Sequence, residues 1–248
     1  MKNWQKFLIP SLFVLIIGSN YMLSVGENGH RSGHVVKVDA NLNQKLDNLV
    51  VMRAYFPQYF EDAQRLENTT VWMKDGYAIP YFAYNGNHVD FSNKVGLIPS
   101  NQQLDVKKLV KAVEPAGTED GVARGAQQVL AVFSMPGSEG LYALPIGAIA
   151  GPQEAYYSDQ LFFYDDPHVI YDHWSKEVWK AIDAHQVLPG MSELQTRMAI
   201  GQNMQPLSLN TGDRTVAYDQ AGKHLTVRFE NNRATSIQDE TAMVAKAD

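Results

Sequence analysis

Five residues that could bind a metal ion or transfer a proton lie within the sequence YYSDQLFFYDDPHVIYDHW. They are Asp165, Asp166, His168, Asp172 and His173. His168 and Asp172 are four positions apart, so on a helix they would share one face and, with Asp166, could hold a divalent cation. One hypothesis for this chain is therefore a metal-dependent enzyme.

The same residues also fit a purely structural interpretation. Asp166 followed by proline is typical of a helix start, because the carboxylate caps free N–H groups and proline suits the first helical position. His173 would lie near the end of that helix, where a positive charge is favoured. The sequence contains no His-Glu-x-x-His motif, Gly-x-Ser-x-Gly elbow or Gly-rich phosphate loop. We therefore favour capping, and predict a protein that is not an enzyme, has no cofactor and has no identified small-molecule substrate.

The composition excludes several classes of function. The 248 residues include no cysteine, which excludes disulfides, thiolate metal ligands and a cysteine-borne lipid anchor. The formal net charge of -6, without long Lys or Arg runs, argues against nucleic acid as a partner. Apolar residues (45%) and charged residues (19%) occur in the proportions of an ordinary globular protein.

The N-terminal sequence MKNWQKFLIPSLFVLIIGSNYMLSVGENG is typical of an export signal. Lys2 and Lys6 precede an apolar block at residues 7–17. Residues 7–25 are long enough to span a bilayer, which predicts an uncleaved signal anchor at 1–25. Because the lysines lie on the short side, this anchor predicts a single-pass inner-membrane protein whose bulk is periplasmic. Cleavage would instead give a soluble periplasmic protein.

The middle of the chain is predicted to be rich in β-strands. A polar linker at 26–40 and a helical segment at 41–66 come first. From 67 to 165, short runs of aromatic and β-branched residues alternate with turn pairs, and Asn85-Gly86 favours a hairpin. This pattern predicts a β-rich domain with the form of a small barrel or sandwich.

Residues 166–240 are predicted to form a smaller α+β domain, followed by a tail at 241–248. Ser175 can cap one helix, and Ser192 with Gln195 forms a capping box for a second helix, which Gly201 would close in a left-handed conformation. The runs RTVAY, HLTVRFE and ATSIQ alternate with period two and predict a three-stranded meander. The predicted class of the whole chain is α+β: an N-terminal membrane helix, a central β-rich barrel or sandwich, and two helices on a three-stranded antiparallel sheet.

Residues 174–238 resemble the SmpA/OmlA (BamE-like) family of bacterial envelope proteins. The resemblance lies in Pro189-Gly190-Met191-Ser192, with Gln195 three positions on, and in HLTVRFENNRATSIQ, which is similar to the family's L-x-V-x-F-x-x-G-x-V hairpin. Asn232 stands where the family usually has glycine, and QNMQ lengthens the loop after Gly201. The resemblance implies the two-helix, three-stranded fold and a role in supporting an envelope protein complex.

Together these features predict an extracytoplasmic binding or scaffold protein, tethered to the membrane by its N-terminal helix, that supports the assembly or stability of a cell-envelope complex. We expect the partner to dock on GQNMQPLSLNTG, which carries Met204, Leu207 and Leu209 without a helix or strand period, and on the adjoining turn of Gly190 and Met191. The alternative is a metal-dependent envelope enzyme that uses the acidic and histidine cluster at 165–173.

Overall fold

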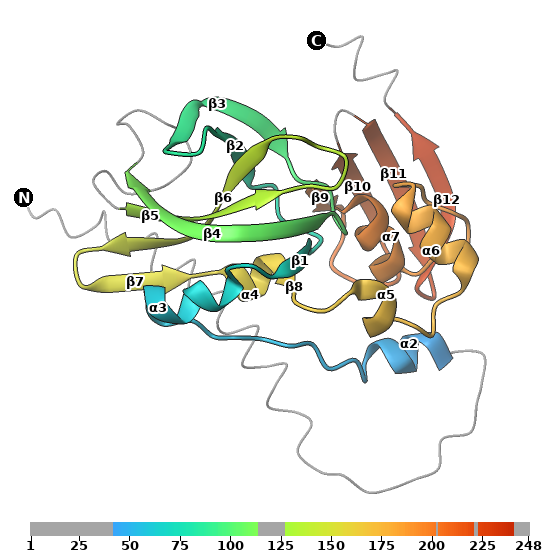
Figure 1. Ribbon diagram of the computed structural model, residues 1–248. Coiled ribbons are helices and arrows are strands. Elements are labelled where there is room, and N and C mark those ends of the chain that lie inside the picture. Colours follow the sequence, from blue (N-terminus) through green and yellow to red (C-terminus); the bar gives the residue numbers. More distant parts are fainter. Residues whose placement is uncertain (1–41, 114–126, 202, 221–222, 241–248) are drawn as a thin grey trace, which may run out of the picture. The chain divides into compact units, whose positions relative to one another are not determined.

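The computed structural model describes residues 42–113, 127–201, 203–220 and 223–240, and Asn41–Asp248 belong to one compact unit. The described residues form two antiparallel sheets, one of eight strands and one of four (Figure 1). The longest described helices, α6 (Lys176–Asp183) and α7 (Glu193–Ile200), have only eight residues each. The predicted α+β class is therefore wrong, because the chain is mostly β.

No helix in the described part of the chain is long and apolar enough to cross a membrane. This finding contradicts the predicted single-pass inner-membrane localisation. It also contradicts the predicted membrane tether and signal anchor. The segment 1–25 itself, the predicted linker at 26–40 and the tail at 241–248 lie outside the described residues.

The eight-stranded sheet contains the strands of the middle of the chain. Its order is β3-β2-β6-β5-β4-β1-β8, and β7 pairs with β6 outside this path. The strands are β1 (Thr70–Met73), β2 (Pro80–Tyr84), β3 (Val89–Leu97), β4 (Gln103–Val113), β5 (Gln127–Ser134), β6 (Leu141–Ala150), β7 (Gln153–Tyr156) and β8 (Phe162–Phe163). Among the described strands the path ends at β3 and β8 without closing. One open sheet therefore replaces the predicted small barrel or sandwich.

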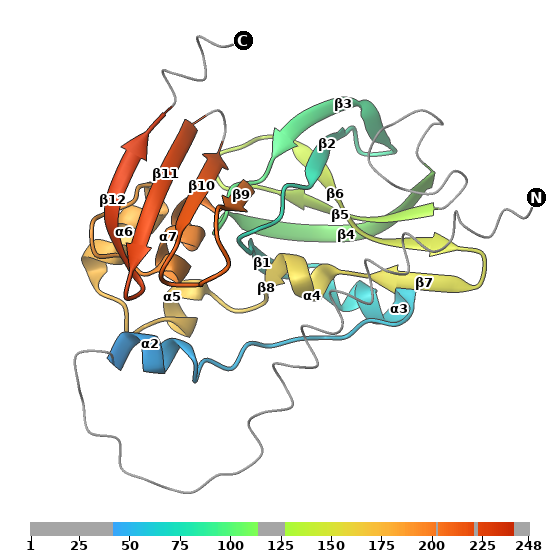
Figure 2. The same ribbon diagram turned by 180° about the vertical axis from the view of Figure 1, so that it is seen from behind.

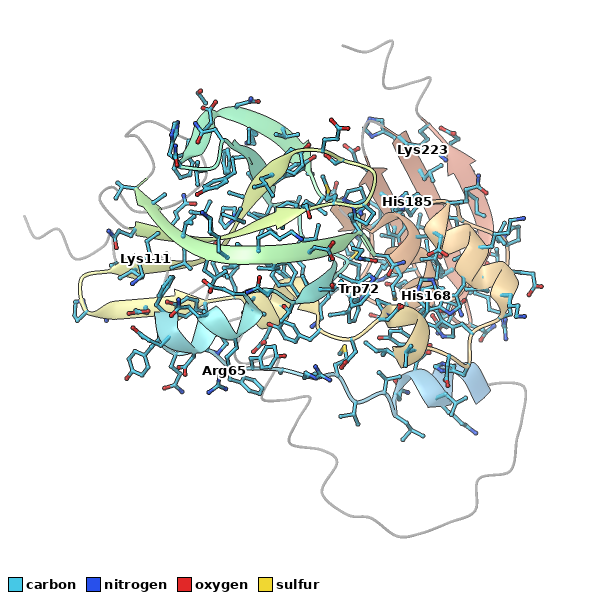
Figure 3. All side chains as sticks on the ribbon, in the orientation of Figure 1. Arg65, Trp72, Lys111, His168, His185 and Lys223 are labelled. Carbon is cyan, nitrogen blue, oxygen red and sulfur yellow. The ribbon has the colours of Figure 1, made fainter. Side chains whose placement is uncertain are left out.

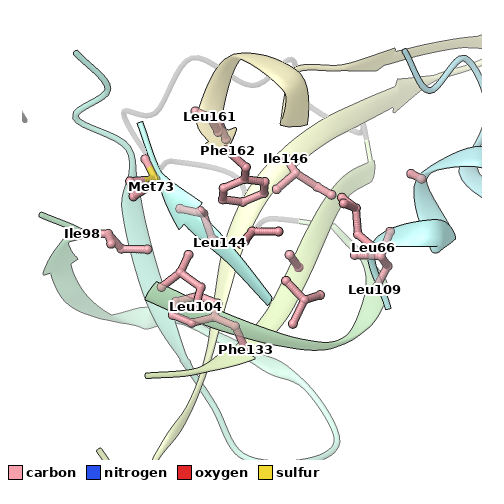
Figure 4. Packing of buried hydrophobic residues seen from close by; sticks show 14 of the residues in the cluster. Leu66, Met73, Ile98, Leu104, Leu109, Phe133, Leu144, Ile146, Leu161 and Phe162 are labelled. Atoms are coloured by element: carbon pink, nitrogen blue, oxygen red, sulfur yellow. The ribbon is translucent and has the colours of Figure 1, made fainter. Parts of the chain in front are cut away.

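Strand β5 shows why this region is so apolar in sequence. Its alternate residues enter two separate hydrophobic cores, one on each face of the sheet: Val129, Ala131 and Phe133 in the first, Leu130 and Val132 in the second. Figure 4 shows the first core, in which side chains from several strands pack together. Because both faces are covered, β5 lacks the polar alternation by which a half-exposed strand is recognised.

The four-stranded sheet has the order β12-β11-β10-β9 (Figure 2). Its strands are β9 (Asn203–Pro206), β10 (Thr215–Gln220), β11 (Lys223–Glu230) and β12 (Arg233–Asp239). The predicted meander corresponds to β10, β11 and β12. The fourth strand, β9, was predicted as loop; it pairs with β10, with Met204 opposite Tyr218. The prediction of a three-stranded sheet is therefore wrong.

The core of the four-stranded sheet is not confined to the C-terminal residues. The predicted buried face of the meander is indeed buried at Val216, Tyr218, Leu225, Val227 and Phe229. Helices α6 and α7 pack on it, but Trp72 from β1, Phe163 from β8 and Val50 also belong to the same cluster. The C-terminal region is therefore not the small two-helix unit of the BamE-like prediction.

The helix starts follow the predicted capping residues. Ser175 accepts a hydrogen bond from the Val178 N–H, and Ser192 and Gln195 form a reciprocal capping box at α7. The predicted left-handed cap at Gly201 is wrong, because its φ is -84°. A side chain there would collide with the Arg197 carbonyl oxygen, so the position needs glycine for space rather than for conformation.

The remaining helices are short. They are α2 (Leu42–Asp47), α3 (Phe60–Ala63), the 3-10 helix η2 (Gln64–Leu66), α4 (Ser158–Leu161) and α5 (Pro167–Ile170). The helix expected through Leu49 and Arg53 instead ends at Asp47, and residues 51–58 are not helical. Helix α4 occupies part of a run that was predicted as strand.

Candidate protein-binding site

Part of the predicted docking loop, residues 201–212, forms strand β9, and the rest lies in the loop between β9 and β10. We call residues 207–214 the leucine loop. Leu207 and Leu209 are 59% and 93% exposed. Met204 precedes the loop in β9, where its side chain packs against the core beneath the sheet. The structure therefore brings two of the three predicted apolar residues to the surface and assigns the third to the core.

A buried ion pair connects the leucine loop to the start of α7. Glu193 is only 2% exposed, and its carboxylate pairs with the guanidinium of Arg214. The same carboxylate accepts a hydrogen bond of 2.8 Å from the Gly212 N–H. Arg214 also donates to the Ser208 carbonyl oxygen at 3.5 Å. Glu193 and Arg214 thus fix both ends of the loop backbone, and either charge would be left uncompensated without the other.

The turn between β11 and β12 supports the loop from the other side. Asn231 and Asn232 both have positive φ angles, 50° and 57°, as a tight hairpin turn requires. Asn232 donates its N–H to the Gly212 carbonyl at 2.8 Å, and its side-chain oxygen accepts from the Glu193 N–H at 3.1 Å. Asn231 donates its N–H to the Asp213 carboxylate at 2.6 Å. Hydrogen bonds therefore tie together the loop, the hairpin turn and the α7 start.

The predicted turn of Gly190 and Met191 adjoins this assembly through β12. Gly190 has a φ of 87° and donates its N–H to the Ala234 carbonyl at 2.9 Å, while Ala234 donates to Met191 at 2.8 Å. Gly190 is exposed, but Met191 is buried in the core. Of the five predicted docking residues, Gly190, Leu207 and Leu209 are thus available to a partner.

The acidic and histidine cluster does not converge on one point. Asp165 pairs with Arg53 at 2.8 Å, and His173 Nε2 lies 2.7 Å from an Asp47 oxygen. Asp172 is exposed on the turn after α5. The described residues contain no group of three or more His, Asp or Glu side chains that could hold a metal ion.

His168 and Asp166 form the one pair within the predicted metal set. Asp166 caps α5 by accepting the His168 N–H at 2.9 Å, as the sequence predicts, and its carboxylate also contacts His168 Nδ1 at 2.8 Å. On the other side of the His168 ring, which is labelled in Figure 3, Nε2 lies 3.2 Å from Asp183, and the imidazole stacks on Trp179. Burial lowers the pKa of His168, but the hydrogen bonds to Asp166 and Asp183 outweigh it and raise that pKa above its ordinary value.

No family model, curated protein or solved structure matches this chain. The resemblance of residues 174–238 to the SmpA/OmlA family therefore stays a prediction.

The sequence alone does not identify the residues that hold the leucine loop in place. Glu193 is in the first turn of α7, where an acidic residue is common at the surface. Its role depends on Arg214 and Asn232, which are 21 and 39 residues away. Only the Asn231-Asn232 turn could have been recognised locally, because asparagine tolerates positive φ.

Proposed function

We propose that this chain is a non-catalytic binding or scaffold protein, which supports the assembly or stability of a larger protein complex through the leucine loop. The observation that carries the proposal is the exposure of Leu207 and Leu209 on a backbone that a buried ion pair holds in place. A loop that is already ordered loses little conformational entropy when a partner binds, so its apolar contacts contribute more to affinity.

The composition of the loop also suits a protein interface. Burying one leucine side chain contributes about 1.5–3 kcal/mol, so two leucines supply an apolar centre of useful strength. The polar residues Ser208, Asn210 and Thr211 lie beside them in sequence. An apolar centre with a polar rim is the usual arrangement in protein–protein interfaces.

A metal-dependent enzyme has no comparable support. The three residues predicted as ligands are not gathered, since Asp166 and His168 are occupied with each other while Asp172 faces solvent.

The test compares two variants of the full chain, expressed in its native host and cross-linked before purification. Leu207→Asp/Leu209→Asp should lose the proteins that co-purify with the unmodified chain, because two charges would be placed in the apolar centre of the interface. The melting temperature should stay within about 2 °C, because neither side chain belongs to the core.

Val51→Asp is the matched control. Val51 is 93% exposed, like Leu209, but lies on the segment between α2 and α3. This variant should retain the co-purifying proteins. If Leu207→Asp/Leu209→Asp keeps them as well, or if it melts much earlier than the unmodified chain, the leucine loop is not a docking site.

A further inference from the structure

A second possible binding feature is an open surface pocket over α6, remote in sequence from the leucine loop. Its volume is about 570 Å³, and its lining is mostly apolar. The lining residues are His168, Lys176, Trp179, Lys180, Asp183 and Ala184. Five of the six come from α6 or the residue that follows it, and His168 comes from α5.

Two lysines and one aspartate border this pocket. Lys176 and Lys180 are one helical turn apart and border the same pocket, and neither ammonium group forms an ion pair with a described residue. The carboxylate of Asp183, by contrast, already has donors, His168 Nε2 at 3.2 Å and Asn101 Nδ2 at 3.3 Å. These donors do not remove the charge of Asp183, and Lys176 also interacts electrostatically with Glu177, so the excess of positive charge at the pocket is small. Lys176 and Lys180 are the cationic groups that an anion would meet there. Their attraction is local, since salt screens it beyond about 8 Å and the chain as a whole is acidic.

The remaining wall is aromatic. The rings of His168 and Trp179 stack with centroids 4.0 Å apart, and Trp179 also packs against Trp174 at 5.2 Å. The Trp179 indole is held by a hydrogen bond to the Tyr171 carbonyl oxygen. Trp179 is only 8% exposed, whereas the His168 side chain is 40% exposed, so the aromatic surface that the pocket offers is mainly the His168 ring, fixed on Trp179 beside the two lysines. This combination suits a ligand with an apolar or aromatic part and a carboxylate.

We propose that the α6 pocket binds an acidic peptide segment of a partner protein, with a Glu or Asp carboxylate between Lys176 and Lys180 and an adjacent apolar side chain against His168 and Trp179. A free small molecule fits less well, because small-ligand sites usually enclose most of the ligand surface and this pocket is open. The inference does not rest on the leucine loop, which is a different surface.

The experiment titrates the full chain with acetyl-Glu-Phe-Glu-amide, with the uncharged acetyl-Gln-Phe-Gln-amide and with 3-phenylpropionate. The Trp179 indole N–H is followed by NMR and is assigned from Trp179→Phe. We expect the Glu peptide to shift this signal with an affinity at least tenfold higher than that of the Gln peptide or of 3-phenylpropionate. Lys176→Gln/Lys180→Gln should weaken the Glu peptide at least tenfold.

Lys223→Gln is the control, since Lys223 is an exposed lysine on β11 (Figure 3). It should leave the affinity unchanged. Equal affinity for the Glu and Gln peptides, or no effect of the double lysine variant, would overturn the anion site. Tighter binding of 3-phenylpropionate than of the Glu peptide would overturn the peptide ligand in favour of a small carboxylate. None of these results depends on whether a partner binds the leucine loop.

Discussion

At the scale of single residues, His168 is the group through which pH should affect stability. Its imidazole lies between the carboxylates of Asp166 and Asp183, with Lys176 and Lys180 bordering the same pocket. Burial lowers the pKa of His168, but the hydrogen bonds and charges of the two carboxylates together outweigh burial, so the pKa in the folded state is raised. A raised pKa stabilises the folded state below the unfolded value of about 6.5, and this contribution is lost as the pH rises through the folded value.

We therefore expect His168→Gln to destabilise the protein more at pH 5.5 than at pH 8.5. The difference should stay below about 1 kcal/mol, because the side chain is 40% exposed and solvent screens its charge. Urea unfolding at both pH values measures it. In an Asp166→Asn/Asp183→Asn background only burial still acts on the pKa of His168, so the extra cost of His168→Gln at pH 5.5 should vanish or reverse in sign. A larger cost at pH 5.5 than at pH 8.5 that persists in this background would refute the account of the raised pKa.

The second residue-scale prediction concerns the ion pair under the leucine loop. Glu193→Ala should cost about 3–5 kcal/mol of unfolding free energy, because it leaves the Arg214 guanidinium buried and unpaired. Glu230→Ala is the control: its pair with Arg228 is exposed on both sides, and its loss should cost less than about 1 kcal/mol. Chemical denaturation of the two variants gives the comparison. Similar small losses would mean that the Glu193 pair does not hold the loop.

At the scale of elements, Phe229 of β11 tests the packing of α6 and α7 on the four-stranded sheet. Its ring is 1% exposed and belongs to the core shared by the sheet and these helices. Phe229→Ala should cost about 3–5 kcal/mol, because it removes a large buried ring and leaves a cavity. Thermal and denaturant unfolding check this value. A loss of less than about 1 kcal/mol would show that the sheet face is not packed as described.

The elements also show which features the sequence could predict. The capping box of Ser192 and Gln195 involves residues three positions apart, so the local sequence contains all of its information. Strand β9 was missed because it has no period-two pattern and depends on pairing with β10, whose partner residues are ten or more positions away. The apolar run of β5 predicted a strand, but only the structure shows that its two faces enter different cores.

The candidate site also combines features that the local sequence predicts with features that depend on residues far apart in the chain. Exposure of Leu207 and Leu209 could be predicted from a loop without periodicity, and the structure agrees. Met191 and Met204 had the same apolar character, but tertiary packing buries the first and partly buries the second. The pairing of Glu193 with Arg214 and the stacking of His168 on Trp179 both join separate elements, so sequence spacing could not reveal them.

At the scale of the whole described unit, contacts between the two sheets place the leucine loop on a larger support than the C-terminal strands alone. Asp75, which follows β1, pairs with Arg197 of α7 at 2.6 Å, and the next residue, Gly76, donates its N–H to the Gly201 carbonyl at 2.6 Å. Trp72 and Phe163 of the large sheet enter the core under the small one. The helix that anchors the loop is therefore itself held by both sheets.

The most direct test of the central claim places a photo-reactive residue on the loop itself. Benzoylphenylalanine in place of Leu209 should, on illumination in the native host, form a cross-link to one defined partner protein, which mass spectrometry identifies. The same residue in place of Val51, which is equally exposed, should not capture that protein. A single partner cross-linked from position 209 and absent from position 51 is the predicted result. The same captured proteins at both positions, or none at position 209, would contradict a docking role for the leucine loop.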